Sequence, residues 1–140
     1  MNLLLTLLLT LPAPARAADA EDAVKSSVVQ IFTVIKEPDY YEPWKLGYQN
    51  NSGGSGVIIA GNRILTNAHV VSNQVFVQVR KTGDDKKYTA QVQFVAHDSE
   101  TALLTVDDPE FFKGTTPAGF GTLPFQRDKV AAYGFPIGGD

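Results

Sequence analysis

Short apolar segments with a two-residue period, each bounded by turn residues, constrain the fold of this chain more than any other feature. The clearest pair is 56–60 and 63–66, which Gly61 and Asn62 separate. Glycine and asparagine tolerate the positive φ angles that a two-residue hairpin turn requires. The pattern therefore predicts a β-hairpin at this point.

Other segments show the same strand character. Residues 28–35 are rich in β-branched side chains and too short for a globular helix. Residues 101–106 and 129–133 bring the count to about seven strands, whereas the only helix we expect is one turn at 20–25. A two-residue alternation also runs through Val75, Val77 and Val79 and, after a turn, through Tyr88, Ala90, Val92 and Phe94. This pattern predicts an all-β fold, built as a small closed barrel.

The composition restricts the chemistry. The 140 residues include 12 Lys and Arg against 15 Asp and Glu, so we expect no phosphate-binding surface and no nucleic-acid partner. The absence of cysteine excludes a disulfide framework, a thiolate nucleophile and a cysteine zinc site. His69, His97 and Asp98 lack the spacing of zinc ligands. We therefore expect no metal and no cofactor.

The first segment has the pattern of a targeting signal. Residues 3–11 hold seven leucines and are followed by two prolines and Ala15-Arg16-Ala17. This pattern predicts a cleaved signal peptide over 1–17, with a second cleavage site at 18–20 and a retained N-terminal anchor as alternatives. Nine apolar residues are too few to span a bilayer, so we expect a periplasmic or secreted protein without integral membrane insertion.

Residues 37–52 have the composition of a long surface loop, with two prolines and one glycine. The loop also carries four aromatic residues, namely Tyr40, Tyr41, Trp44 and Tyr48. These side chains either contact a ligand or partner, or pack the loop onto its own domain. The second arrangement is the commoner one for aromatic loops.

Acid–base chemistry near neutral pH is limited to His69 and His97. His69 directly follows a predicted strand, where a rigid element can direct its ring into a cleft. A lone histidine at a strand end is nevertheless more often structural than catalytic.

Four motifs together resemble a known family. Gly-Ser-Gly-Val-Ile-Ile at 54–59 and Ile-Leu-Thr-Asn-Ala-His-Val-Val at 64–71 resemble the start of a trypsin-like serine protease of the HtrA/Deg group. Ala-Leu-Leu-Thr-Val at 102–106 and Val-Ala-Ala-Tyr-Gly-Phe-Pro at 130–136 extend the likeness. Such enzymes have two six-stranded barrels, of which the first provides the histidine and acid and the second the serine and oxyanion hole.

The resemblance implies a division of the chain. A signal peptide at 1–17 and a lead-in at 18–27 would precede the first β-barrel, at 28–128. Residues 129–140 would begin a truncated second barrel.

The resemblance also implies roles for individual residues. His69 is expected to be the general base, because a serine hydroxyl is a poor nucleophile until an imidazole accepts its proton. Glu100 stands where the family has aspartate, and its carboxylate is one methylene further from the backbone. Asp98 is a second candidate for the acid that orients the imidazole.

The nucleophile is missing from these residues. No serine follows Ser99, although the family's serine comes after the acid. Ser55 lies in a Gly-Ser-Gly that belongs to the first barrel, so we expect it to be structural, and Thr115 and Thr116 are poor substitutes. We therefore expect an inactive fragment of an exported serine endopeptidase.

The expected partners follow from the same resemblance. HtrA/Deg proteases hydrolyse misfolded or exported polypeptides and form homo-oligomers, with a trimer as the expected form. Half of a two-barrel unit would also expose an apolar face and associate. The alternative is a non-catalytic secreted β-barrel, a pseudoprotease that acts as a peptide-binding or interaction module.

Overall fold

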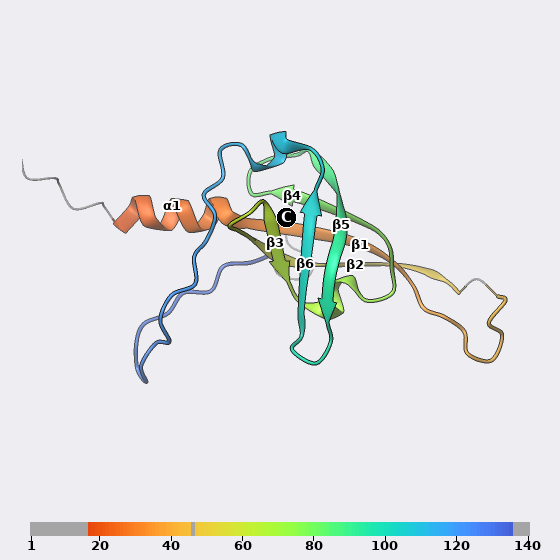
Figure 1. Cartoon of the computed structure of the whole chain (residues 1–140). Helices are drawn as coiled ribbons and strands as arrows, with labels where there is room; N and C mark the ends of the chain where they lie inside the picture. Colours follow the sequence, from red (N-terminus) through yellow and green to blue (C-terminus); the bar gives the residue numbers. More distant parts are fainter. Residues whose placement is uncertain (1–16, 46, 136–140) are drawn as a thin grey trace, which may run out of the picture.

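The computed structural model describes residues 17–45 and 47–135, so the predicted signal peptide lies outside the described residues except for Ala17. Six antiparallel strands form a closed barrel in the order β1-β2-β3-β6-β5-β4 (Figure 1). Their bounds are β1 (Val28–Lys36), β2 (Gln49–Ile59), β3 (Arg63–Thr66), β4 (Gln74–Lys81), β5 (Lys87–Ala96) and β6 (Thr101–Val106). The expected all-β barrel is confirmed.

The hairpin predicted at 56–66 joins β2 to β3. Val57 pairs with Leu65 and Ile59 with Arg63, so the turn comprises three residues, 60–62, rather than the expected two. Gly61 and Asn62 have φ angles of 83° and 54°, which are the positive values that such a turn requires. Because β1 pairs with β4 as well as with β2, the sheet closes on itself and leaves no free edge.

The interior of the barrel is filled by alternate side chains of each strand. Fully buried members are Val29, Ile31, Ile58, Ile64, Val77, Val79, Ala102 and Leu104. A short 3-10 helix, η1 (Pro109–Phe112), adds the fully buried ring of Phe111. This ring packs edge-on against Tyr88, with 5.1 Å between the ring centres. The core of the barrel is therefore mainly aliphatic, and the rings of Phe111 and Tyr88 pack together at its side.

Two expectations about secondary structure were wrong. The helical turn expected at 20–25 is an 11-residue helix, α1 (Ala17–Ser27), in which Lys25 pairs with Glu21 one turn earlier at 2.9 Å. Residues 129–133 form no strand. A strand needs an edge to pair with, and the closed barrel offers none.

The alternation expected along β5 breaks at a bulge. The register of β5 with β6 shifts between Val92 and Phe94. An extra residue in one strand reverses the faces of those that follow. Phe94, which the alternation places on the same face as Val92, is therefore 56% exposed, and Val95 packs against the core instead.

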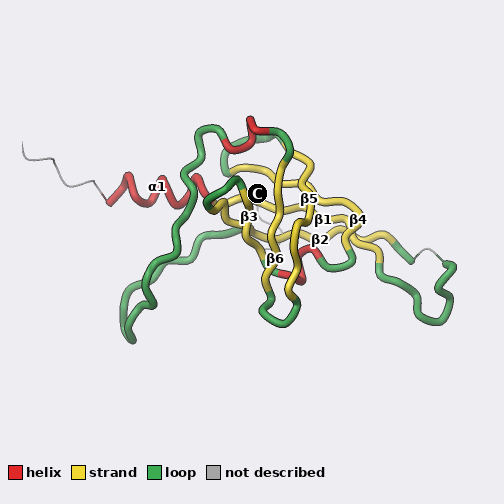
Figure 2. Tube along the Cα trace, in the orientation of Figure 1, coloured by secondary structure: helices red, strands yellow, loops and turns green. Residues whose placement is uncertain are grey.

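Two long segments lack regular structure (Figure 2). The loop between β1 and β2 is shorter than expected, because β2 already begins at Gln49. It projects from the barrel on the side opposite to α1 (Figure 1). Its aromatic side chains, Tyr40, Tyr41, Trp44 and Tyr48, are 81–94% exposed, so the expectation that they pack onto their own domain was wrong. The other segment follows η1.

None of the helices within residues 17–45 and 47–135 combines the length and apolarity needed to cross a membrane.

Candidate active site

The pairing of β3 with β6 brings His69 and Glu100 to the same end of the barrel. Thr66, the last residue of β3, pairs with Ala102 near the start of β6. In antiparallel strands, the residues that follow one strand lie beside those that precede its neighbour. His69 comes three residues after Thr66 and Glu100 two residues before Ala102. The topology therefore juxtaposes two side chains that are 31 residues apart in the sequence.

His69 lies on a single helical turn, α2 (Ala68–Val71), whose other side chains anchor it. Ala68, Val70 and Val71 are buried, whereas the side chain of His69 is 69% exposed. Glycine at position 54 makes this packing possible, because a Cβ atom there would lie 2.6 Å from a methyl group of Val70. The Gly-Ser-Gly motif thus allows the histidine-bearing turn to rest directly on β2.

Glu100 holds both the backbone and the ring of His69. The backbone N–H of His69 donates to Glu100 Oε1 at 2.9 Å, and the ring Nδ1 lies 2.5 Å from the same oxygen. These hydrogen bonds, with the backbone one as the largest contribution, lower the pKa of the Glu100 carboxyl from its ordinary value of 4.5. The carboxylate is therefore ionised near neutral pH. It accepts a hydrogen bond from the N–H group at Nδ1 of the ring.

The backbone of Glu100 is unusual. Glu100 has a φ of 54°, in the left-handed region that few residues with side chains adopt. Its own N–H donates to the carbonyl of His97 at 3.2 Å, which closes a turn just before β6. Strained backbone of this kind is common at functional sites.

The other candidates lie outside this pair. No hydrogen bond or ion pair joins Asp98 to His69 in the described part of the chain, and His97 meets Glu100 through its backbone carbonyl. Within residues 17–45 and 47–135, no group of three His, Asp or Glu side chains could hold a metal. The structure thus selects Glu100 over Asp98 as the carboxylate that meets the imidazole.

Ser55 lies on β2, and its hydrogen bonds join it to Phe135 and Thr66. Its Oγ accepts the backbone N–H of Phe135 at 2.7 Å, and its carbonyl accepts the hydroxyl of Thr66 at 2.8 Å. These bonds tie the C-terminal segment and the end of β3 to β2. Ser55 therefore makes structural contacts, as the sequence predicted.

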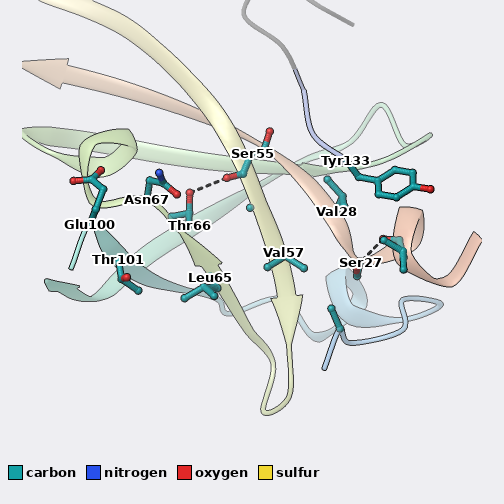
Figure 3. Close-up of a pocket in the computed structure, with 13 residues that line it drawn as sticks. Ser27, Val28, Ser55, Val57, Leu65, Thr66, Asn67, Glu100, Thr101 and Tyr133 are labelled. Carbon is teal, nitrogen blue, oxygen red and sulfur yellow. Dashed lines mark hydrogen bonds between the residues drawn. The ribbon is translucent and has the colours of Figure 1, made fainter. Parts of the chain in front are cut away.

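A pocket of about 420 Å³ runs along β2 and β3 beside the pair. Figure 3 shows Glu100 and Asn67 at one end of this pocket and Tyr133 at the other. Val57 and Leu65 contribute apolar side chains between the two ends. No pattern in the sequence indicates this surface, because it combines residues from α1, four strands and the C-terminal segment.

The arrangement has a defined chemical capacity. A carboxylate on Nδ1 selects the tautomer whose proton lies there and leaves Nε2 with its lone pair free to accept a proton. The same carboxylate stabilises the imidazolium that results. A base of this kind activates a hydroxyl nucleophile that approaches Nε2.

Comparisons with known proteins agree with this geometry. Residues 54–140 match the family model of the trypsin-like peptidase domain. "Protease Do-like 4, mitochondrial" from Arabidopsis thaliana is 44% identical over 119 residues, which are 85% of this chain and 23% of that protein. The chain thus spans less than a quarter of the length of this relative.

Solved structures show the same barrel. A protease from M. tuberculosis, solved in its active form, superimposes with a TM-score of 0.58 at 27% identity, over 88% of this chain and 51% of that one. The HtrA-type protease AlgW, solved with a tripeptide, gives a TM-score of 0.57 at 20% identity, over 76% of this chain and 30% of that one. At this identity the second comparison concerns the fold alone.

Proposed function

The chain belongs to the trypsin-like peptidases of the Do-like, or HtrA, group, and from this membership we propose that it provides the histidine and the carboxylate of a serine endopeptidase site. His69 is the general base, and Glu100 is the acid that orients it. The contact between Glu100 Oε1 and His69 Nδ1 is the observation that carries the proposal.

The proposed mechanism follows from the protonation of the two groups. Glu100 holds the proton on Nδ1, so Nε2 accepts the proton of a serine hydroxyl as the hydroxyl attacks a peptide carbonyl. The imidazolium then donates this proton to the leaving amine, and water repeats the sequence to release the acyl group. Glu100 stays ionised throughout and stabilises the imidazolium.

The nucleophile of this proposal is not among the present residues. No serine follows Ser99, and Ser55 is bound to Phe135. The serine and the oxyanion hole therefore come from outside residues 1–140, and these residues alone do not hydrolyse peptide bonds. The substrates are polypeptides, with misfolded or exported proteins as the proposed class.

Export through a cleaved signal peptide is proposed from the leucine-rich residues 3–11 and the Ala15-Arg16-Ala17 that follows them. N-terminal sequencing of the protein recovered from its native host tests this point. A mature N-terminus at residue 18 or 21 supports export through a cleaved signal. An intact Met1 contradicts it.

A serine-reactive fluorophosphonate tests the catalytic proposal. We expect no labelling of the 140-residue chain, and labelling when its C-terminus is joined to a second barrel that contains Gly-Asn-Ser-Gly-Gly. His69→Ala should abolish labelling of the joined protein, and Glu100→Gln should lower its turnover by roughly 10⁴-fold, because the imidazole loses its fixed tautomer.

The alternative function is a non-catalytic module that binds polypeptides, which is favoured by the replacement of the family's aspartate by Glu100. This alternative predicts that the joined protein binds unfolded polypeptides. It also predicts that the joined protein and its His69→Ala variant react with the fluorophosphonate at the same rate. Ser55→Ala is the matched control, because that serine is expected to contribute nothing to labelling.

A further inference from the structure

The loop between β1 and β2 carries a pocket that the proposed peptidase chemistry does not use. This pocket, here called the loop pocket, has a volume of about 390 Å³. Its lining includes Glu37, Asp39, Tyr40, Tyr41, Tyr48 and Asn50. Three aromatic rings and two carboxyl groups therefore share one concave surface.

The backbone of the loop is held in shape by local contacts. A Cβ atom at Gly47 would lie 2.2 Å from the carbonyl oxygen of Glu37, so the two sides of the loop touch at its base. Asp39 Oδ1 accepts the N–H groups of Tyr41 at 2.9 Å and of Glu42 at 3.2 Å, which forms a tight turn. These contacts fix the backbone beneath the loop pocket, which lowers the entropy cost of ordering the loop on binding.

The charges of the loop pocket are negative. The one lysine of the loop, Lys45, is paired with Glu42 at 2.7 Å. The carboxylate of Glu37 has no hydrogen bond or ion pair within the described ranges, 17–45 and 47–135. Glu37 and Asp39 therefore present negative charge that no lysine or arginine of the loop neutralises.

The tyrosines present their rings to solvent beside these carboxylates. Tyr40 is 85% exposed, Tyr41 94% and Tyr48 93%. Faces of aromatic rings attract cations, and carboxylates also attract cations by their negative charge. A cation–π contact of this kind already occurs on the barrel, where Lys87 Nζ lies 3.7 Å from the centre of the Phe32 ring.

We propose that the loop pocket binds the cationic side chain of a lysine or arginine in an extended polypeptide. Charge complementarity selects this occupant over an acidic or purely apolar one. A guanidinium or ammonium group can lie against the tyrosine faces while Glu37 and Asp39 pair with its charge.

The position of the loop pocket gives the proposal a functional setting. The N–H of Lys36, at the end of β1, donates to the carbonyl of Asn73 at 3.0 Å. Asn73 follows α2, the turn that carries His69, by two residues. The loop therefore starts from the same end of the barrel as the imidazole. Binding itself does not depend on the proposed peptidase function, and its test uses no hydrolysis.

The fluorescence of Trp44, the single tryptophan of the chain, reports on the loop directly. The 140-residue chain is titrated with a ten-residue peptide of alternating arginine and serine, and with the same peptide carrying citrulline, the uncharged isostere of arginine. We expect a saturable change with the arginine peptide and binding at least about fivefold weaker with the citrulline peptide.

Variants locate the binding. Glu37→Gln and Tyr48→Leu should each weaken binding of the arginine peptide about two- to fivefold. Glu110→Gln is the matched control, because it removes one carboxylate from η1, where Glu110 pairs with Lys113. Circular dichroism confirms that each variant is folded. Equal binding of the two peptides, binding unchanged by both loop variants, or no binding at all would overturn the proposal.

Discussion

One oxygen atom of Glu100 accepts two hydrogen bonds from a single residue, His69. Its Oε1 lies 2.9 Å from the backbone nitrogen and 2.5 Å from the ring Nδ1. The carboxylate therefore fixes the position of the helical turn and the orientation of the imidazole at the same time. A glutamate in place of the family's aspartate reaches the ring, and its backbone adopts a left-handed conformation.

Glu100→Ala is expected to change the tautomer of His69. Without the carboxylate, the proton is no longer held at Nδ1, and the two neutral tautomers become mixed. Nitrogen-15 NMR of the histidine ring measures this equilibrium. Asp98→Ala is the matched control and should leave the His69 signals unchanged. A tautomer that responds to Asp98→Ala and not to Glu100→Ala would contradict the assignment of the acid.

The stability of the chain should depend on pH through Glu100. Hydrogen bonds from His69 hold the pKa of this carboxyl below its ordinary value of 4.5, so its ionised form favours the folded state. This stabilisation is fully present above pH 4.5 and is lost as the pH falls through the lowered pKa. In thermal melts, the wild type should exceed Glu100→Gln in Tm at pH 7, and the difference should shrink below pH 4.5. A constant difference across this range would refute the linkage.

Gly54→Ala is expected to destabilise the fold and displace α2. The new Cβ atom would lie 2.6 Å from a methyl group of Val70, a β-branched side chain that cannot easily move away. Overpacking of this kind costs about 1–3 kcal/mol, which urea denaturation measures. Gly119→Ala is the control, because no atom lies within 4 Å of its new Cβ. A loss of stability no larger than that of the control would show that α2 tolerates the extra methyl.

Phe111→Ala should lower the free energy of unfolding by about 3–5 kcal/mol, because its ring is fully buried and packs against Tyr88 and Phe112. Phe125→Ala removes the same atoms from a side chain that is 84% exposed. Its effect should stay within about 0.5 kcal/mol. Similar effects of the two substitutions in chemical denaturation would argue against the packing of η1 onto the barrel.

Much of the barrel could be predicted from the sequence, because the alternation of apolar side chains is a local property. The strands at 63–66 and 101–106 begin and end where the pattern placed them, and the turn at Gly61-Asn62 has the expected positive φ angles. The prediction failed where a distant partner decides the outcome. The bulge in β5 and the missing strand at 129–133 depend on which edges are available for pairing.

The candidate site divides in the same way. The chain has only two histidines, so the sequence by itself determined that an imidazole base must be His69 or His97. The motif around His69 favoured that residue. Only the tertiary structure decided between Asp98 and Glu100. The two carboxylates lie in one turn, and the dihedral angles of that turn, together with the β3–β6 register, decide which of them reaches a ring 31 residues away.

The aromatic loop also required the fold. Its composition indicated a surface segment, but it could not show whether the rings pack inward or face solvent. That outcome depends on whether the barrel leaves apolar surface beside the loop, which is a property of the assembled sheet. The structure places the rings outward, next to Glu37 and Asp39, because the loop projects from the end of the barrel.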